Sequence, residues 1–257
     1  MLAFELCSMA DADRLTTVFE ATETSFADEQ WAAFVQASPR GGSGDCARIV
    51  PRRDGRALFF IGDVAGHDPR AVALAGDLDA RISHLARWAS PGALLEELNT
   101  AVEAGWPSDT FVSAICFLLD PLTGRGIIAV AGQVPPVIKS DSGCRTVEVS
   151  TAPALGLVAD QGYPERAFML EAGDVLVAVT DGITDPFATG GDLLGLGELA
   201  RLLHGSPIDP AAICASLLGA TRRCGLQDDA TVLAVAPRLT RRRRRCRAAP
   251  AEMSLTV

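Results

Sequence analysis

Four aspartates, each next to an apolar segment, are the residues of this chain whose type and spacing suggest chemistry. Asp63 and Asp181 follow apolar runs, whereas Asp45 and Asp228 stand just before them. Aspartate and glycine are also common in ordinary turns, so a turn would explain each of these residues taken singly. Because two of them flank one predicted hairpin and the others border core-like strands, we expect the four carboxylates to form a joint site.

The chemistry that suits such a site is that of a hard divalent cation. Carboxylates gathered with few bases nearby select Mg²⁺ or Mn²⁺ in oxygen coordination, and a chain with only three histidines offers no histidine-rich zinc site. Two such ions about 3.5–4 Å apart lower the pKa of a bridging water and clamp an in-line displacement at phosphorus. Asp63 is well placed to bridge them, and hydrolysis would then need no nucleophile from the protein.

A predicted β-hairpin positions the first two aspartates. The apolar run 57–62 is typical of a buried strand, and a shorter strand candidate covers 45–50. An Asp-Gly pair between them is a strong turn signal. The hairpin brings Asp63 near Asp45, because each lies at the end of its strand away from the turn.

Further hairpins and paired helices fill the rest of the chain, which favours antiparallel sheets covered by helices over a doubly wound parallel sheet. Ser90-Pro91 has the residue types of a helix N-cap and first turn, and weak helical patterning covers 10–34. The other expected strands are 111–119, 126–131, 137–139, 146–149, 167–170, 175–179 and 230–236, and the expected helices are 69–88, 91–104, 196–203 and 210–224.

Charge is distributed unevenly along the 257 residues. Residues 1–237 carry 31 acidic and 16 basic side chains, and the last stretch, 238–257, carries seven arginines and one glutamate. An acidic body is unsuited to a nucleic-acid backbone, so no nucleic-acid partner is expected. Seven cysteines without a CxxC pair indicate reduced thiols in a cytoplasmic protein. No run of 18 apolar residues predicts a membrane span.

The stretch Gly62-Asp63-Val64-Ala65-Gly66-His67 resembles the GDVxGHG signature of the SpoIIE/RsbU-like branch of bacterial metal-dependent protein phosphatases, the PPM superfamily. The resemblance covers roughly residues 40–237, with further blocks in the family's order. These are Ser43–Asp45, Phe111–Gly124 (the lDPxtG hairpin), Ala131–Pro136 (AGHxPP), Pro153–Leu157 (PLGL), Gly173–Asp185 (GDxLxxxTDGxxE) and Asp228–Thr231 (DDxT).

The resemblance implies an α+β fold, in which two stacked antiparallel β-sheets are flanked by helix pairs as an α-β-β-α sandwich. It also implies two Mn²⁺ or Mg²⁺ ions bridged by Asp63, with Asp229 replacing Asp228 if the alignment is shifted by one residue. The implied metal ligands are Asp45, Asp63, the Val64 carbonyl, Asp181 and Asp228.

The activity implied by the resemblance is hydrolysis of phosphoserine or phosphothreonine on a regulatory protein, by attack of a metal-activated water. In this branch the substrate, and therefore the partner, is often an anti-sigma-factor antagonist. The retained aspartates favour this enzyme over an alternative of another class. That alternative is a catalytically weak PPM-like module that binds a phosphoprotein as a scaffold.

Two departures from the family pattern keep the alternative open. The second glycine of GHG is Asp68 here, and the histidine of AGH is Gln133. Asp68 could bind a water of the metal shell, but an Asp-Pro pair at a helix start better fits capping of the helix that begins at Pro69. His67 could protonate the leaving serine oxygen, since its reference pKa of about 6.5 suits a general acid, or it could only order the turn.

The predicted organisation has three parts. Residues 1–40 form an N-terminal segment, partly helical and a candidate regulatory element, and 41–237 form the PPM-type phosphatase domain. Residues 238–257 form an Arg-rich, disordered tail. This tail could be inert in solvent, contact nucleic acid or an anionic membrane, or fold against the acidic body, and we expect the first.

Overall fold

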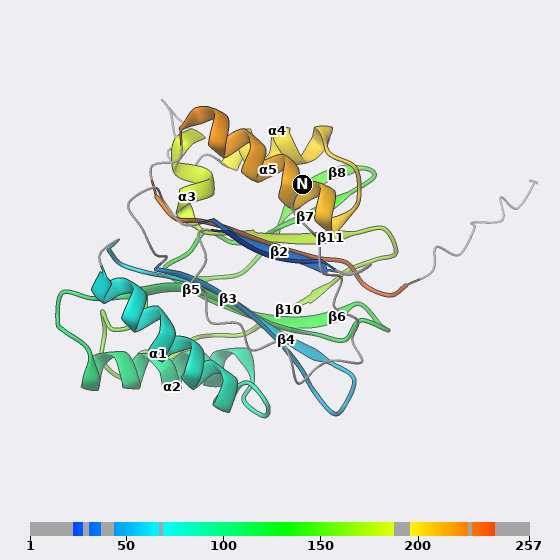
Figure 1. Ribbon diagram of the computed structural model, residues 1–257. Helices are drawn as coiled ribbons and strands as arrows, with labels where there is room; N and C mark the ends of the chain where they lie inside the picture. The colour runs from blue at the N-terminus through cyan, green and yellow to red at the C-terminus, as the bar shows by residue number, and fades with distance from the viewer. Residues whose placement is uncertain are drawn as a thin grey trace, which may run out of the picture.

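The computed structural model is an α-β-β-α sandwich, the α+β fold that the resemblance implied (Figure 1). Two sheets stack face to face, and helices cover the outer face of each. The structure describes residues 23–27, 31–36, 44–66, 69–187, 196–225 and 228–239, the first two ranges as backbone only. Within these ranges, no helix has both the length and the apolar character that crossing a membrane requires.

Sheet 1 has the strand order β1-β2-β12-β11-β7-β8, and every neighbouring pair is antiparallel. Alternate residues of its apolar central strands face opposite sides. Leu176 and Leu233 therefore pack between the sheets, whereas Val177 and Val232 pack under helices. The strands are β1 (Glu23–Ala27), β2 (Trp31–Gln36), β12 (Ala230–Val235), β11 (Val175–Val179), β7 (Val137–Ser140) and β8 (Gly143–Thr146).

Sheet 2 has the order β10-β6-β5-β4-β3, all antiparallel, with β9 added parallel to β6. Phe59 and Ile61 of β4 face the other sheet. The ring of Phe59 stacks at 4.7 Å on that of Phe117, its cross-strand partner on β5 of the same sheet. Phe60 faces the helices instead. The strands are β10 (Arg166–Met169), β6 (Arg125–Ala131), β5 (Val112–Leu119), β4 (Ala57–Val64), β3 (Asp45–Pro51) and β9 (Thr151–Ala152).

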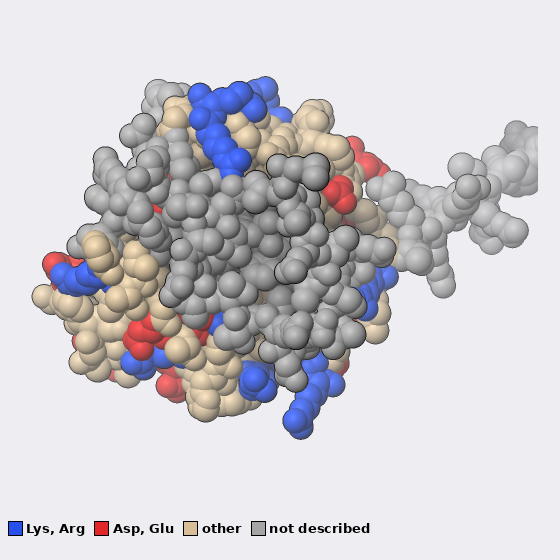
Figure 2. Space-filling model, viewed as in Figure 1, with Lys and Arg blue, Asp and Glu red and all other residues tan. Residues whose placement is uncertain are grey.

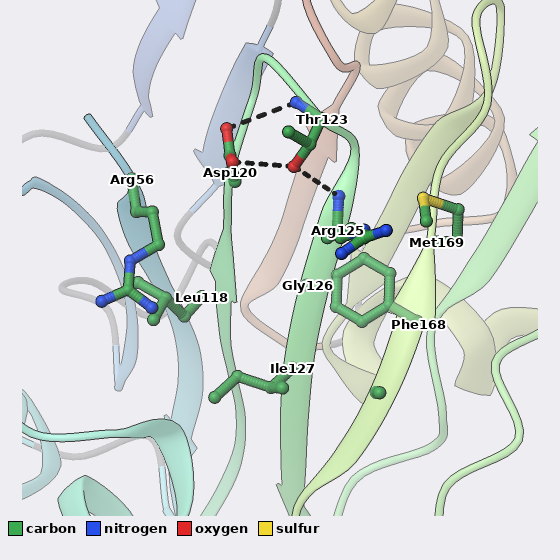
Figure 3. Close-up of a pocket in the computed structure, with 10 residues that line it drawn as sticks. Arg56, Leu118, Asp120, Thr123, Arg125, Gly126, Ile127, Phe168 and Met169 are labelled. Carbon is green, nitrogen blue, oxygen red and sulfur yellow. Dashed lines mark hydrogen bonds between the residues drawn. The ribbon is translucent and has the colours of Figure 1, made fainter. Parts of the chain in front are cut away.

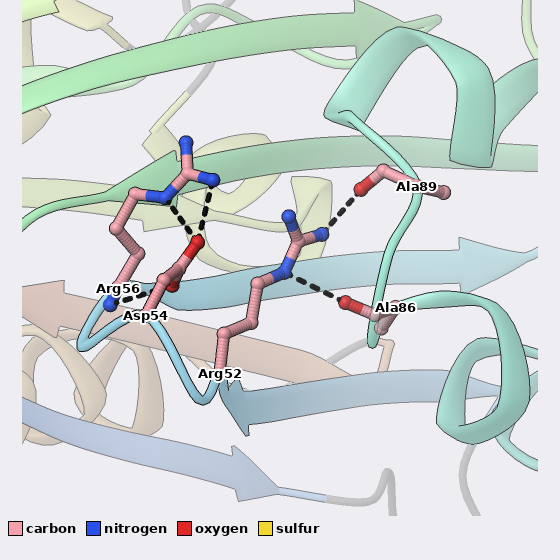
Figure 4. A network of polar contacts seen from close by, with 5 residues as sticks. All are labelled: Arg52, Asp54, Arg56, Ala86 and Ala89. Carbon is pink, nitrogen blue, oxygen red and sulfur yellow. Dashed lines mark hydrogen bonds and ion pairs between the residues drawn. The ribbon is translucent and has the colours of Figure 1, made fainter.

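Helices α1 (Pro69–Leu85) and α2 (Pro91–Gly105) cover sheet 2. The predicted N-cap of α2 is confirmed, because the Ser90 side chain accepts a hydrogen bond from the Ala93 amide. Figure 4 shows how the far end of the β3–β4 hairpin is tied to the α1–α2 connection. The Arg52 guanidinium donates to the Ala86 carbonyl at 2.9 Å and also to the Ala89 carbonyl. This tie fixes the hairpin at the end opposite to the aspartates.

The helices over sheet 1 lie in the C-terminal half of the chain. A short helix follows β11 directly and starts at Asp181, and the apolar face of α5 packs on β12. Asp209 caps α5 by accepting a hydrogen bond from the Ala212 amide at 2.8 Å. The helices are α3 (Asp181–Thr184), the 3-10 helix η2 (Asp185–Phe187), α4 (Leu196–Gly205) and α5 (Pro210–Cys224).

Two predictions of secondary structure are wrong, and several others lie outside the described residues. The helical expectation for 10–34 fails at β1 and β2, which are strands, and β2 pairs with β12 in sheet 1. The strand expected at 146–149 is instead β8, because Ser140 pairs with Gly143 in a tighter turn. The remainder of the 1–40 segment and the tail beyond residue 239 are outside the described part, and the three-part division stays a prediction.

Candidate metal centre

Asp45 and Asp63 lie opposite each other at one end of the sandwich. They are Cα partners in the β3–β4 pair, in the register that the hairpin predicted. Directly opposite residues of an antiparallel pair share a face, with their Cβ atoms about 4.5–5.5 Å apart. Ile61 lies two residues before Asp63 on the same face of β4 and is part of the core between the sheets. Both carboxylates therefore point into the end of the intersheet space.

Two threonines of sheet 1 hold the Asp45 carboxylate. Asp45 is buried, and its Oδ2 accepts hydrogen bonds from Thr180 Oγ1 at 2.8 Å and from Thr231 Oγ1 at 2.6 Å. Thr180 Oγ1 also accepts the Thr231 amide at 2.9 Å. The first aspartate of sheet 2 is therefore tied to the ends of the two central strands of sheet 1.

The aspartates of sheet 1 approach the same place from the other side. Asp181 begins α3, directly after Thr180. Asp229 is buried and its Oδ2 accepts the Gly44 amide at 2.7 Å, whereas Asp228 is exposed and its Oδ1 accepts the Asp229 amide at 2.9 Å. Asp228 therefore has the more accessible carboxylate of the two, and Asp229 links the start of β12 to the start of β3.

Burial and mutual repulsion raise the pKa values of three of these carboxyl groups, those of Asp45, Asp63 and Asp181. Burial raises the pKa of Asp63 to about 7, and the charges of Asp181 and Asp228 add to the shift. Burial and the charge of Asp63 raise the pKa of Asp45 well above its usual range. The pKa of Asp181 is raised by burial and by its acidic neighbours Asp185 and Asp228. After burial, the largest contributions that raise these three pKa values come from neighbouring carboxylates.

The Val64 carbonyl lies close to Gly44, the residue before Asp45. A Cβ placed on Gly44 would come within 2.9 Å of that oxygen and within 3.1 Å of the Gly66 carbonyl oxygen. This close approach explains why glycine is needed there. His67 and Asp68, the next residues of the signature, are outside the described part of the chain. The roles expected of them stay predictions.

The donor set suits a hard divalent cation. It consists of carboxylates and a backbone carbonyl, which are oxygen ligands of the kind that Mg²⁺ and Mn²⁺ prefer. Burial and the charges of neighbouring carboxylates raise the pKa values of Asp45, Asp63 and Asp181, and a bound cation would offset both effects. No group of three or more His, Cys, Asp and Glu side chains in the described ranges is arranged as a complete site for an ion. The ligand assignment to Asp45, Asp63, Val64, Asp181 and Asp228 therefore stays a prediction.

Sequence reasoning missed the residues that hold the aspartates. Thr180 directly precedes Asp181, and Thr231 closes the DDxT block, so both were visible beside predicted ligands. Ser113 was missed as well, although it is the Cα partner of Asp63 on β5. Its position depends on strand register, which the β5 sequence alone does not give.

A separate hollow of about 760 Å³ lies at the other end of sheet 2 (Figure 3). The close-up shows Phe168 and Met169 of β10 beside the turn that carries Asp120 and Thr123. The Asp120 carboxylate accepts hydrogen bonds from Thr123 Oγ1 at 2.7 Å and from the Leu122 amide at 2.9 Å. Because these bonds close the turn itself, Asp120 has a structural role there.

Comparison with known proteins identifies the family. The chain resembles the RsbU and RsbW domains of Rv1364c from Mycobacterium tuberculosis at 24% identity and a TM-score of 0.69, covering 83% of this chain and 62% of that one. It resembles the PP2C phosphatase domain and regulatory fragment of SpoIIE from Bacillus subtilis at 20% identity and a TM-score of 0.69, covering 83% and 64%.

RsbX in complex with magnesium matches at 14% identity and a TM-score of 0.62, covering 82% of this chain and 98% of that one. These likenesses show a PP2C-type fold, and the chain spans less than two thirds of the length of the first two proteins. The family model described as stage II sporulation protein E (SpoIIE) matches residues 53–238. The chain therefore belongs to the SpoIIE family of PP2C-type (PPM) phosphatase domains.

Proposed function

We propose that this protein is a Mn²⁺- or Mg²⁺-dependent serine/threonine protein phosphatase. The observation that carries the proposal is the meeting of Asp45 and Asp63 from one sheet with Asp181 and Asp228 from the other. Such a set of carboxylates, which raise one another's pKa values, is suited to holding cations. Membership of a phosphatase family supports the same activity.

In this proposal the predicted ligands hold two ions. When bound, Mn²⁺ or Mg²⁺ supplies Lewis acidity, which lowers the pKa of a coordinated water and neutralises charge on the phosphoryl oxygens. Asp63, which lies opposite Asp45 and interacts with the charges of Asp181 and Asp228, would hold both ions. Thr180 and Thr231 hold Asp45 in place. His67 is the proposed general acid for the leaving serine oxygen.

The proposed substrate is a phosphoserine or phosphothreonine on a regulatory protein, and an anti-sigma-factor antagonist is the candidate. The similarity to a protein that carries RsbU and RsbW domains supports a role in the same kind of signalling. On the face seen in Figure 2, Lys and Arg side chains gather at the top, whereas acidic and basic side chains lie near each other at the lower left. The described cysteines are free thiols, which supports a reducing, cytoplasmic setting.

Phosphate release from a phosphoserine peptide tests the proposal, in Mn²⁺ or in EDTA. Wild-type protein should release phosphate only with Mn²⁺, and Asp63→Asn and Asp181→Asn should abolish release. Asp54→Asn is the matched control, because Asp54 lies in the same hairpin as Asp63 but at its far end, where it pairs with Arg56. Folded wild-type protein that binds Mn²⁺ without turnover would favour a scaffold, and turnover unaffected by either substitution would exclude the site.

A further inference from the structure

A buried glutamine lies close to the candidate metal centre without being one of its ligands. Gln133 is 6% exposed, and its Nε2 donates a hydrogen bond to Ser113 Oγ at 2.8 Å. The backbone around it is fixed. The Gly132 amide donates to the Ala152 carbonyl at 2.7 Å, and Thr151 Oγ1 donates to the Gln133 carbonyl at 3.3 Å. The amide side chain is therefore held toward β5.

Ser113, the partner of this glutamine, lies opposite Asp63 on the next strand. The two residues are Cα partners in the β4–β5 pair, just as Asp45 and Asp63 are partners in the β3–β4 pair. Partners in an antiparallel pair have side chains on the same face. The polar residues Asp45, Asp63 and Ser113 thus form one row across three strands, at the end of the face that otherwise carries apolar core residues.

The number of hydrogen bonds that a hydroxyl can make limits the partners to which Ser113 can donate. A serine hydroxyl has one hydrogen to donate and two lone pairs that accept. Since Gln133 occupies one of the accepting positions of Ser113, the hydroxyl hydrogen is left for another acceptor. In the described structure Ser113 makes no hydrogen bond to Asp63, its cross-strand partner, so the bond to that carboxylate is one that metal binding would form. Partners of this kind orient metal-binding carboxylates, and their removal typically lowers metal affinity about 10–100-fold.

We propose that Gln133 and Ser113 are positioning residues, in which Gln133 orients the Ser113 hydroxyl and that hydroxyl fixes the Asp63 carboxylate for metal binding. The inference rests on the proposed function, because it assigns a role toward the metal ions. It gives the glutamine that replaces the family's histidine a task that histidine could also perform, since both side chains offer an N–H donor.

Calorimetric titration with Mn²⁺ tests the proposal, with phosphate release and thermal unfolding in EDTA measured beside it. Ser113→Ala should raise the Kd for Mn²⁺ about tenfold, whereas Ser113→Thr, which keeps the hydroxyl, should stay within about twofold of wild type. Gln133→Met should weaken Mn²⁺ binding, whereas Gln133→His should keep most of the wild-type affinity for Mn²⁺. Combining Ser113→Ala with Gln133→Met should be no worse than Ser113→Ala alone.

Three results would overturn the inference. The first is that Ser113→Ala and Ser113→Thr change the Kd equally. The second is that the effects of Ser113→Ala and Gln133→Met on the Kd are additive in the double variant. The third is that every variant lowers the unfolding temperature without changing the Kd. If Ser113→Ala does not fold, the Gln133→Met and Gln133→His pair decides by the same measurement. Wild-type protein that neither binds Mn²⁺ nor releases phosphate would overturn the proposed function itself. If wild-type protein is active and Ser113→Ala leaves the Kd for Mn²⁺ unchanged, only this inference would be overturned.

Discussion

Thr231 Oγ1 donates a 2.6 Å hydrogen bond to Asp45 Oδ2, and this bond joins the two sheets at the candidate metal centre. Thr180 makes a second bond to the same oxygen and also accepts the Thr231 amide. One buried carboxylate oxygen is thus held by the ends of β11 and β12. The sandwich itself, rather than a loop, positions the first predicted ligand.

The two threonines should differ in their effect on stability. Thr231→Val removes one hydrogen bond to Asp45 and should lower the free energy of unfolding by about 1–2 kcal/mol. Thr180→Val also leaves the buried Thr231 amide without its acceptor, so its loss should be larger by roughly 1–2 kcal/mol. Urea denaturation measures both, with Thr180→Ser as the variant that keeps the hydroxyl. An equal loss in the two valine variants would contradict the double role of Thr180.

The metal-free protein should become less stable as pH rises from about 4 to about 7. The pKa of Asp63 is raised to about 7 in the folded protein, above its usual value of 3.8, so the folded state holds a proton that the unfolded state releases. The stabilising contribution of that proton is complete below the unfolded pKa and is lost as pH rises through the folded pKa. Urea unfolding in EDTA at pH 5 and pH 8 measures the difference.

Asp63→Asn should abolish this loss of stability of the metal-free protein at high pH. The uncharged amide removes the repulsion, so the variant should be more stable than wild type in EDTA at pH 8, by an amount on the order of a few kcal/mol. Added Mn²⁺ should stabilise wild type and leave the variant unchanged, because a cation that binds only the folded state stabilises it. A variant less stable than wild type at pH 8 would count against repulsion at this site.

The parts of the fold that the sequence predicted well are those with local signals. Strand β11 is a run of five apolar residues between turns, and α5 begins at an Asp-Pro cap, so the bounds of both were predicted correctly. Strand β2 has no such signal. Its sequence, WAAFVQ, contains good helix formers, and its strand structure comes from pairing with β12, almost 200 residues later in the chain.

The candidate site shows the same division between local and non-local information. Strand ends and turns identified the aspartates, and the hairpin register placed Asp45 opposite Asp63. The hydroxyls of Thr180 and Thr231 reach Asp45 only because the second sheet stacks on the first. No local pattern in the sequence specifies that stacking, so the supporting residues could not be assigned a role before the fold was known.

One substitution should have opposite effects at two glycines. A Cβ on Gly182 would lie 1.8 Å from the Asp229 carbonyl oxygen, so Gly182→Ala must displace α3 or the start of β12. We expect a loss of about 1–3 kcal/mol, together with weaker Mn²⁺ binding. Gly76→Ala is the control. It lies inside α1 with open space around its Cβ, and it should stabilise the protein by about 1 kcal/mol. Thermal unfolding separates the two, and similar effects at both positions would contradict the packing.

For the buried ion pair between Arg48 of β3 and Asp79 of α1, removing one partner should destabilise the protein much more than removing both. Both residues are buried. Arg48→Met should cost about 3–5 kcal/mol, because it leaves the Asp79 carboxylate buried without its cation, and Asp79→Leu in the same protein should restore most of the loss. Burial raises the pKa of Asp79, so the loss of stability in the single variant should become smaller as pH falls from 8 to 5 and protonation of this carboxyl becomes easier.

The exposed pair Arg81–Asp77 on the same helix is the matched control for that experiment. Exposed pairs four residues apart contribute only about 0.3–0.5 kcal/mol, so Arg81→Met should have a small effect that barely changes with pH. Urea denaturation of wild type and these three variants at both pH values tests the contrast. If Arg48→Met were as mild as Arg81→Met, or if the double variant were no more stable than the single one, the buried pair would not be the link between β3 and α1. Because β3 carries Asp45, a real link would also make Mn²⁺ binding weaker in Arg48→Met and normal in Arg81→Met.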